Sequence, residues 1–524
     1  MIGFKLRYLK KIRVVLSLLF FIPISILFLD PRNGIPAAVS NFFTALQLIP
    51  SLTKLFVFFG WMTLGLAVVV FLTLLFGRVY CSTLCPLGTF QDIVIRIRKK
   101  IHKRKRHIFV KPAYTIHYGI FALSAVLAFL GSMTLLNLLE PFSNYGRMVT
   151  SLVEPLVTIF NNISAGIIGR FNWYFLYKVP LRGVDLNTIL YPLFFLLLIG
   201  YLAYSHGRLF CNLLCPAGAL LGLLSRLSLY NIIVDTENCN HCGACERVCK
   251  SNCIQSDNQK IEFAACVGCF NCISACPTGG VSYARSRAPM TRRSADKFTA
   301  SRRKFFSELI TPAIGTVFYP LAATDSTTTA TSGYEASRNI PISPPGSQGI
   351  NRYSSLCTAC HLCVSVCPSQ VLYPSFLHYG IAGIFQPMMN YTASYCNYEC
   401  TVCSQICPTG AILPVSIEEK KLVQIGKATF FKDDCIVVAK KKDCAACSEH
   451  CPTKAVHMVP YEGKLNIPEL NNDICVGCGG CEHACPTTPR KAIYVTANQV
   501  HAQAKKPPTK KQEDGFDSSK DFPF

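Results

Sequence analysis

The stretch CVGCFNCISACP, residues 266–277, decides the fold of the chain around it. Its cysteines are spaced CxxCxxCxxxCP. This spacing lets one tight loop aim three sulfurs at three corners of a [4Fe-4S] cube while the fourth reaches a second cube. CNHCGACERVC, residues 239–249, carries the same cysteine spacing just upstream. Together the two groups predict an α+β module with two [4Fe-4S] clusters in residues 230–290.

The same kind of group recurs along the chain, and all 29 cysteines lie at or after Cys81. Twenty-four form six groups of four, two of them stretched, with three residues between Cys396 and Cys400 and eight between Cys435 and Cys444. In bacterial ferredoxins, three close cysteines share a cluster with the last cysteine of the neighbouring group. This rule predicts six ligand sets: Cys239, Cys242, Cys245 and Cys276; Cys266, Cys269, Cys272 and Cys249; Cys357, Cys360, Cys363 and Cys407; Cys396, Cys400, Cys403 and Cys367; Cys435, Cys444, Cys447 and Cys485; Cys475, Cys478, Cys481 and Cys451.

One ligand position leaves an alternative open. Cys249 is followed by Lys250, where the other five groups have proline. Cys253, which belongs to no motif, could therefore replace Cys249 as a ligand, although the usual ferredoxin pattern favours Cys249.

Three other uses of cysteine fit the spacing less well. A disulfide framework would spread its cysteines through loops, and a zinc ribbon needs only two CxxC pairs, whereas each group here has a fourth cysteine. Residues 357–361, CTACH, also match the haem c attachment signature. Because both of those cysteines complete a cluster motif, we expect His361, like His241, to be an ordinary loop residue.

Apolar runs in the first 205 residues predict a membrane domain. Half of the 524 residues are hydrophobic, and a helix needs roughly 20 apolar residues to cross a bilayer. Four runs qualify, at about 12–29, 55–76, 114–136 and 186–204, and they predict an α-helical membrane domain in residues 1–229, with loops at 30–54 and 137–185. The net charge is +23, and part of it lies in RIRKKIHKRKRH, residues 96–107, directly after an apolar run. This position favours a cytoplasmic membrane flank over a nucleic-acid surface and places the N-terminus in the cytoplasm.

An internal repeat follows the second and fourth of these spans. GRVYCSTLCPLG, residues 77–88, and GRLFCNLLCPAG, residues 207–218, share the pattern GRxxCxxxCPxG. On one interpretation each proline marks a helix restart and the thiols are small buried hydrophobes. On the other, two thiol pairs at the same membrane depth meet and bind a further metal or iron–sulfur centre. That possible centre would use Cys81, Cys85, Cys211 and Cys215.

SRRKFF, residues 301–306, stands in the middle of the chain, although it reads like an export signal. A mildly apolar segment follows it, so residues 291–323 predict a twin-arginine motif with a fifth transmembrane segment at 305–323. A simple positively charged anchor is the alternative. A linker rich in Ser, Thr, Pro and Gly is expected at 324–350, then a four-cluster region at 351–500 and a disordered tail at 501–524.

These motifs together resemble two protein families. The four spans, the two GRxxCxxxCPxG repeats and the first pair of clusters resemble the NapH/MauN membrane polyferredoxins. The twin arginines with CTVCSQICPTGAIL and CVGCGGCEHACP, residues 400–413 and 475–486, resemble the NapG/MauM exported ferredoxins. The resemblance implies a fusion of the two, of the quinol dehydrogenase type. It also explains the internal signal, because the twin-arginine translocase exports domains that have already folded around their clusters.

The function expected from this resemblance is electron transfer in the bacterial inner membrane. Electrons would pass from quinol or a cytoplasmic donor to a periplasmic partner protein, with residues after about 323 in the periplasm. The motifs identify no catalytic residue and leave it uncertain whether the chain is itself an enzyme, and no nucleotide-binding fingerprint stands apart from the cysteine motifs. A maturation or sensing protein for a periplasmic metalloenzyme and a subunit of a larger membrane complex remain the alternatives.

Overall fold

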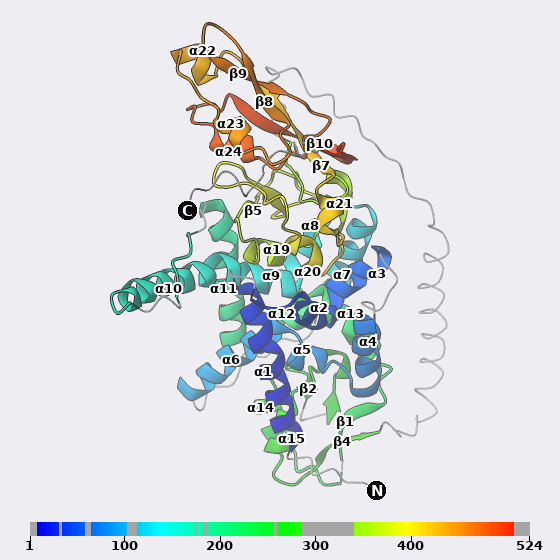
Figure 1. The fold of residues 1–524 in the computed structure, drawn as a ribbon. Coiled ribbons are helices and arrows are strands. Elements are labelled where there is room, and N and C mark those ends of the chain that lie inside the picture. Colours follow the sequence, from blue (N-terminus) through cyan, green and yellow to red (C-terminus); the bar gives the residue numbers. More distant parts are fainter. Residues whose placement is uncertain are drawn as a thin grey trace, which may run out of the picture.

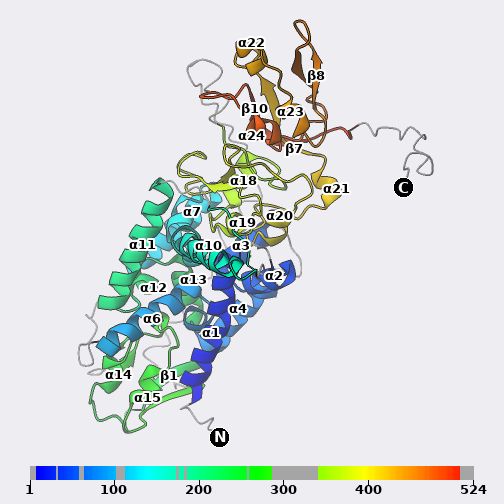
Figure 2. The ribbon, with the colours of Figure 1, turned by 60° about the vertical axis from the view of Figure 1, so that its left-hand side comes forward.

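The computed structural model describes residues 8–30, 34–57, 64–101, 113–172, 176–181, 186–235, 237–255, 259–285 and 340–507. Three parts follow one another along the molecule (Figures 1 and 2). The first cysteine module, residues 230–285, lies at one end, the helical domain, residues 8–229, in the middle, and the second cysteine region, residues 340–507, at the other end. The predicted twin-arginine motif, the fifth transmembrane segment and residues 324–339 of the predicted linker lie outside the described residues.

The helical domain consists of two halves, each with a CxxxCP motif in a short helix. Buried Ile24, Leu48, Leu87, Ile199 and Phe210 belong to its core. The first half contains α1 (Leu9–Phe28), α2 (Ala37–Ala45), α3 (Leu48–Val57), α4 (Leu64–Phe76), α5 (Tyr80–Thr83) and α6 (Pro86–Ile101). The second half contains α7 (Tyr114–Phe129), α8 (Thr134–Leu139), α9 (Pro141–Met148), the π-helix η3 (Val149–Val153), α10 (Glu154–Gly169), α11 (Leu186–Ser205), α12 (Leu209–Leu213) and α13 (Pro216–Ser225).

Among the described residues, three helices are long and apolar enough to cross a membrane: Leu9–Phe28, Pro141–Gly169 and Thr188–Ser205. The first and third coincide with the predicted spans at 12–29 and 186–204. The predicted span at 114–136 is too long, because α7 ends at Phe129 and Gly131, with a φ of 81°, closes a turn before α8. The predicted span at 55–76 falls on the end of α3 and on α4, and the residues between these helices lie outside the described part.

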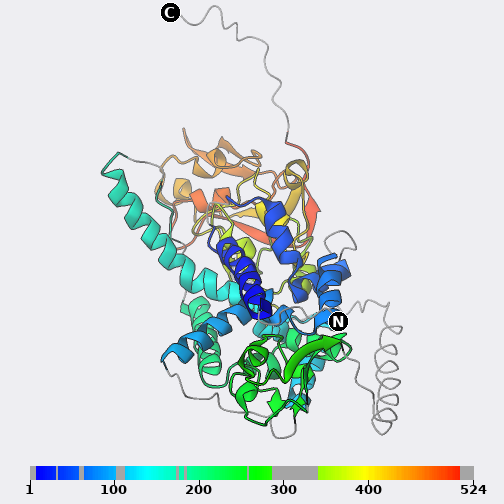
Figure 3. The same cartoon turned by 90° about the horizontal axis from the view of Figure 1, so that it is seen from below.

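The helix Pro141–Gly169 falls inside the predicted loop at 137–185. Pro141 and Pro155 interrupt the apolar pattern there, which weakens any helix signal in the sequence. In the structure Pro141 stands in the first turn of this helix, where a missing N–H costs nothing, and Pro155 follows directly on the π-helix η3, where the regular bonding pattern changes as α10 begins. Glu140 also caps α9, because its carboxylate accepts from Phe142 N at 2.9 Å and from Ser143 N. Helix α10 projects sideways from the bundle in Figures 1 and 3.

The first cysteine module is built from two short antiparallel strand pairs. β1 (Tyr230–Val234) pairs with β4 (Val281–Arg285), and β2 (Ile254–Gln255) pairs with β3 (Lys260–Ile261). Between the strands lie α14 (Ala244–Arg247), the 3-10 helix η4 (Phe263–Ala265) and α15 (Asn271–Ala275). The strands are too short to form a core alone, and buried cysteines supply much of the module's interior.

The second cysteine region contains two hydrophobic cores joined by the long strand pair β7 and β10. Its first part holds α18 (Ile350–Leu356), α19 (Leu362–Ser365), β5 (Leu372–Pro374), β6 (Pro387–Met389), α20 (Val402–Ile406) and α21 (Ile417–Lys420). Its second part holds β7 (Val423–Phe430), α22 (Ile436–Lys440), α23 (Ala446–Glu449), β8 (Val456–Pro460), β9 (Asn466–Leu470), α24 (Gly480–Ala484) and β10 (Ile493–Gln503).

The second cysteine region starts earlier and ends later in the chain than the sequence predicts. The predicted linker extends to residue 350, but Ile342 is buried and its carbonyl accepts from Met389 N at 2.9 Å. Gly346 likewise accepts from Leu413 N at 2.9 Å. The predicted tail from residue 501 is also too long, because β10 continues to Gln503. The proline, serine and glycine content of this stretch is typical of a linker. In the structure, however, the backbone at Ile342 and Gly346 is hydrogen-bonded to the cysteine region that follows.

Candidate functional site

The cysteine loops share a backbone conformation that suits a bound cube. In the four groups with regular spacing, the second and fourth residues after the first cysteine both have positive φ: His241 and Gly243, Gly268 and Phe270, Ala359 and His361, and Gly477 and Gly479. Several of these are not glycine, so the conformation costs energy that the surroundings must offset. Such a turn makes the chain curl around one point. The loops therefore fit the clusters that their spacing predicts.

The structure brings together each of the six predicted sets of four cysteines. Cys239, Cys242, Cys245 and Cys276 line one hollow. In the other sets the sulfurs interact electrostatically; Cys363, for example, interacts with Cys360, Cys357 and Cys407. Even Cys435, across its eight-residue gap, interacts with Cys444 and Cys485. The remaining sets are grouped in the same way. Among the described residues, no three His, Cys, Asp or Glu side chains lie close enough to hold a single metal ion.

A hydroxyl group stands beside the fourth cysteine in five of the six groups. The side chain two residues later lies 3.1 to 3.6 Å from the sulfur in the pairs Cys276–Thr278, Cys367–Ser369, Cys407–Thr409, Cys451–Thr453 and Cys485–Thr487. These hydroxyls can donate to a thiolate ligand. Sequence analysis missed them, although the repeated CP[ST] triplet was a usable signal.

At Cys249 the residue two positions later is Ser251, whose buried hydroxyl has no hydrogen-bond partner among the described residues. Cys253 Sγ lies 3.6 Å from Cys249 Sγ. Cys269 and Cys272 interact electrostatically with Cys249, while Cys253 interacts with both Cys249 and Cys266. The structure thus places both Cys249 and Cys253 at this set, and Cys249 as the ligand stays a prediction from the ferredoxin pattern.

The two CxxxCP motifs meet inside the helical domain, although they are 130 residues apart in the chain. Cys85 interacts electrostatically with Cys81 and Cys211, and Cys215 interacts with the other three. All four sulfurs are buried, with side chains at most 5% exposed. We call Cys81, Cys85, Cys211 and Cys215 the CxxxCP tetrad.

The arginine of each GRxxCxxxCPxG repeat reaches across to the other repeat. Arg78 donates to Cys211 O at 3.0 Å, and Arg208 donates to Cys81 O at 2.7 Å. Each guanidinium also lies 4.0 Å from the sulfur of its own motif's first cysteine. This exchange gives the two repeats an approximate twofold relation around the sulfurs.

The arginines carry buried positive charge next to the tetrad. Arg78 and Arg208 are 1% and 0% exposed. Arg208 pairs with Asp92, while no carboxylate in the described ranges forms an ion pair with Arg78. Burying an uncompensated charge is costly. The guanidinium groups therefore favour thiolates at Cys81 and Cys211, whereas burial and the neighbouring sulfurs raise the pKa of Cys85 and Cys215.

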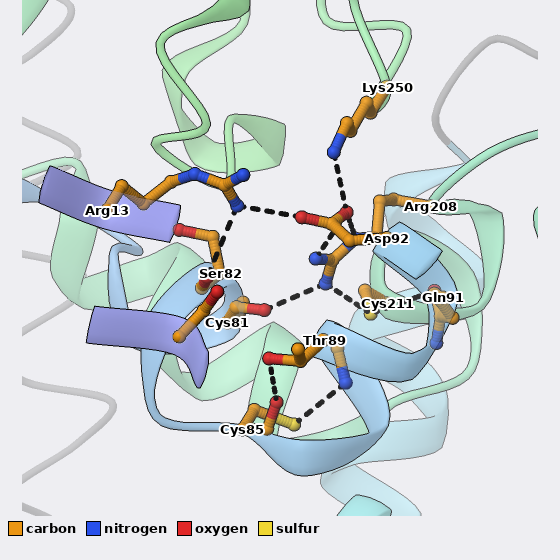
Figure 4. A network of polar contacts seen from close by, with 12 residues as sticks. Arg13, Cys81, Ser82, Cys85, Thr89, Gln91, Asp92, Arg208, Cys211 and Lys250 are labelled. Carbon is orange, nitrogen blue, oxygen red and sulfur yellow. Dashed lines mark hydrogen bonds and ion pairs between the residues drawn. The ribbon is translucent and has the colours of Figure 1, made fainter. Parts of the chain in front are cut away.

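Asp92 stands at the centre of the network in Figure 4. Its carboxylate pairs with Arg13 at 2.7 Å, Arg208 at 2.7 Å and Lys250 at 3.0 Å. Burial opposes ionisation of Asp92, but the charges of these three cations outweigh it and hold the pKa of Asp92 below its ordinary value. Because Lys250 belongs to the first cysteine module, this network joins that module to the helical domain.

Backbone contacts complete the same junction. Arg208 N donates to Lys250 O at 2.8 Å, and Asn212 Nδ2 donates to Ser251 O at 3.2 Å. Gly207, with a φ of 75°, allows this approach, because a Cβ there would lie 2.4 Å from Lys250 O. The first cysteine module therefore packs directly on the second CxxxCP motif.

The second cysteine region docks on the opposite end of the helical domain. Arg147 Cζ lies 5.0 Å and 4.8 Å from the ring centroids of Tyr191 and Phe385, which are 4.5 Å from each other. A Cβ on Gly146 of α9 would lie 2.3 Å from Cys360 O, so the two backbones touch. One continuous buried core consequently contains Cys269 of the first module, the CxxxCP tetrad and Cys360 of the second region.

The sequence analysis did not assign a role to several of these charged side chains. Asp92 lies in a basic, amphipathic stretch with no metal or catalytic motif around it, and Arg78 and Arg208 enter the sequence analysis only as parts of a repeat. Glu140 and Arg147 fall in the predicted loop. Their roles arise from contacts between distant segments, which one sequence does not reveal.

Four family models match the chain, in six ranges. One described as a 4Fe-4S binding domain matches residues 58–104 and 187–232, which hold the two CxxxCP motifs. A 4Fe-4S dicluster domain matches 356–411 and 442–488, and a second dicluster model matches 262–371. A further 4Fe-4S binding domain matches 232–255. The chain thus contains several 4Fe-4S domains.

Three relatives each match less than half of the chain. An uncharacterized protein of Methanocaldococcus jannaschii is 25% identical over 216 residues, covering 41% of this chain and 68% of the relative. The ferredoxin-type protein NapH of Haemophilus influenzae is 25% identical over 223 residues, covering 41% of this chain and 64% of the relative. The ferredoxin-type protein NapF of Escherichia coli K12 is 26% identical over 161 residues, covering 31% of this chain and 87% of the relative.

No solved structure matches the chain. Its 4Fe-4S domains, its apolar helices and its ferredoxin-type relatives agree on electron transfer. The chain is similar to the NapH-like polyferredoxins.

Proposed function

We propose that this protein conducts electrons across the inner membrane, from a quinol or a cytoplasmic donor to a periplasmic acceptor protein. One observation carries the proposal: a single buried core contains Cys269, the four cysteines of the CxxxCP tetrad and Cys360. Cysteines predicted for the two sides of the membrane are thus joined by continuous packed protein. Bound clusters would supply one-electron carriers on either side of this core.

The six cysteine sets would form one row of clusters in the order of their contacts. The set of Cys249 adjoins the tetrad, and the set of Cys360 follows. Cys363 of that set interacts electrostatically with Cys403 of the next. Cys396 N donates to Cys478 O at 2.9 Å, and Cys481 interacts with Cys447. The terminal set, with Cys435, would face the acceptor.

The CxxxCP tetrad would hold a seventh centre between the two groups of clusters. The buried thiols converge there, and Arg78 and Arg208 supply positive charge for thiolate ligands. A centre at this position would shorten the gap between Cys269 and Cys360.

Three parts of this proposal are based on the sequence motifs alone. They are the export of the second cysteine region, the use of quinol as donor, and the fusion of a NapH/MauN-like with a NapG/MauM-like protein. The twin arginines at 302 and 303 would direct the second cysteine region to the periplasm through the twin-arginine translocase. A redox maturation or sensing protein would carry the same clusters, and so would a subunit of a larger complex. Multiple-turnover oxidation of menaquinol by the purified protein favours the conduit over a sensor.

Iron analysis tests the cofactor content. Six cubes predict about 24 iron atoms per chain in anaerobically purified protein. The double variant Cys81→Ser, Cys211→Ser should keep those six clusters and lose only the iron or spectroscopic signal of the seventh centre. Half the iron, or stoichiometric zinc, would contradict the six-cluster assignment. An unchanged iron content and unchanged spectrum in the double variant would remove the seventh centre.

A further inference from the structure

The four residues after Cys249, KSNC, break a pattern that the other five groups keep. There, a proline follows the fourth cysteine and the next residue places its hydroxyl against the sulfur, whereas here Lys250 replaces the proline and the buried hydroxyl of Ser251 has no hydrogen-bond partner in the part of the chain that the structure describes. Each of the four residues nevertheless makes a contact through another group. Lys250 pairs with Asp92, Ser251 O accepts from Asn212, Asn252 donates to His206 O at 3.3 Å, and Cys253 lies against Cys249.

Charge is unevenly distributed at this junction. Arg13, Arg208 and Lys250 share the single carboxylate of Asp92, so two positive charges remain in excess. The side chains of Lys250 and Asp92 are only 10% and 11% exposed, so water screens the network weakly. Lys250 also interacts electrostatically with Cys269, the member of its set that enters the core of the helical domain.

A cluster held by four thiolates is anionic and gains a further negative charge on reduction. Positive charge fixed nearby stabilises the reduced form more than the oxidised form and therefore raises the reduction potential. Within the described residues, the other set of the module has no comparable network, and its Cys242 is exposed. The two clusters of the module would therefore differ in potential.

We propose that Lys250, held by Asp92, raises the reduction potential of the cluster bound by Cys249, Cys266, Cys269 and Cys272, and so makes it the electron-accepting station of the first cysteine module. Lys250 would act through its positive charge and would not be a ligand of the cluster. This inference rests on the proposed function only for the direction of electron flow. The reduction potential of the cluster depends on the charges around it at the junction.

The test is a redox titration of the full-length protein followed by electron paramagnetic resonance. In Lys250→Met, one cluster of the first module should become at least tenfold harder to reduce at fixed potential, which corresponds to about 59 mV for a one-electron centre. Lys250→Arg keeps the charge and should restore the wild-type value. Lys99→Met is the matched control, because Lys99 is an exposed lysine that also interacts with Cys269, and its effect should be clearly smaller.

Three results would overturn the inference: unchanged potentials in Lys250→Met, an equal shift in Lys99→Met, or loss of the cluster itself in Lys250→Met, which would show that Lys250 is structural. Iron content measured on the same samples detects the last case. Because the titration needs no electron transfer across a membrane, it can succeed or fail independently of the conduit.

Discussion

The glycine that ends each GRxxCxxxCPxG repeat offers a sharp perturbation of the CxxxCP tetrad. A Cβ at Gly88 would lie 2.2 Å from Cys81 O and 2.7 Å from Arg208 Nη1. An ordinary van der Waals contact of a Cβ begins at about 3.4 Å, so the carbonyl would have to move by about 1.2 Å. The backbone of α5 and α6 cannot yield that far without disturbing the bond between Arg208 and Cys81 O. We therefore expect Gly88→Ala to separate the two repeats.

The cost follows from overpacking. Extra atoms in a packed core destabilise by about 1–3 kcal/mol, which lowers the melting temperature of a domain of this size by about 2–12 °C. Gly119→Ala is the control, because Gly119 lies within α7 and a Cβ there would meet nothing within 4 Å. Removing that helical glycine should stabilise by about 0.5–1 kcal/mol.

Thermal unfolding in detergent, with iron content measured in parallel, distinguishes the two variants. Gly88→Ala should melt earlier and lose any signal of the seventh centre, while the six cubes stay. Gly119→Ala should melt at or above the wild-type temperature. Equal melting temperatures for the two variants would refute the close packing of the repeats around the tetrad.

Three further predictions concern the rest of the chain. Changing Arg302 and Arg303 to lysine should leave residues 340–507 on the cytoplasmic side, as read by protease protection in spheroplasts; normal exposure would mean that the segment is only an anchor. Burial lowers the pKa of His501 to about 4, so the folded region binds fewer protons than the unfolded chain, and its stability should fall as pH drops from about 6.5 towards 4. Urea unfolding should show this loss in the wild type but not in His501→Gln. Thr487→Val removes the hydroxyl 3.1 Å from Cys485 and should lower the potential of one cluster without loss of iron, whereas an unchanged potential would show that this bond does not tune it.

The grouping of cysteines could be predicted from the sequence because cluster geometry dictates their spacing. The rule that the fourth cysteine crosses to the neighbouring group assigned Cys276 and Cys407 to the sets in which the structure places them. Cys435 also lies near Cys444 and Cys485, since the three-dimensional reach of the loop matters and not the number of residues in it. Their role as ligands remains a prediction until iron is measured.

Hydropathy was a weaker guide. It found the helices at 9–28 and 188–205, but it does not show that Pro141 starts a helix or that Pro155 follows a π-helical segment, so a loop was predicted where a long helix lies. It also extended α7 past Gly131. The charges at the junction could not be foreseen, because Asp92 and Lys250 are 158 residues apart and only the fold brings them together.

The central claim is that electrons cross from the first cysteine module to the second region. The most direct measurement uses oriented proteoliposomes, with a membrane-impermeant reductant acting only on the side of the first module and the redox state of the second region followed by its spectrum. We predict that the second region becomes reduced in the wild type and stays oxidised in the double variant Cys242→Ser, Cys269→Ser. Dithionite added on the other side should still reduce it in the variant. If quinol instead reduces the second region at the wild-type rate in that variant, electrons enter beyond the membrane and the conduit is contradicted.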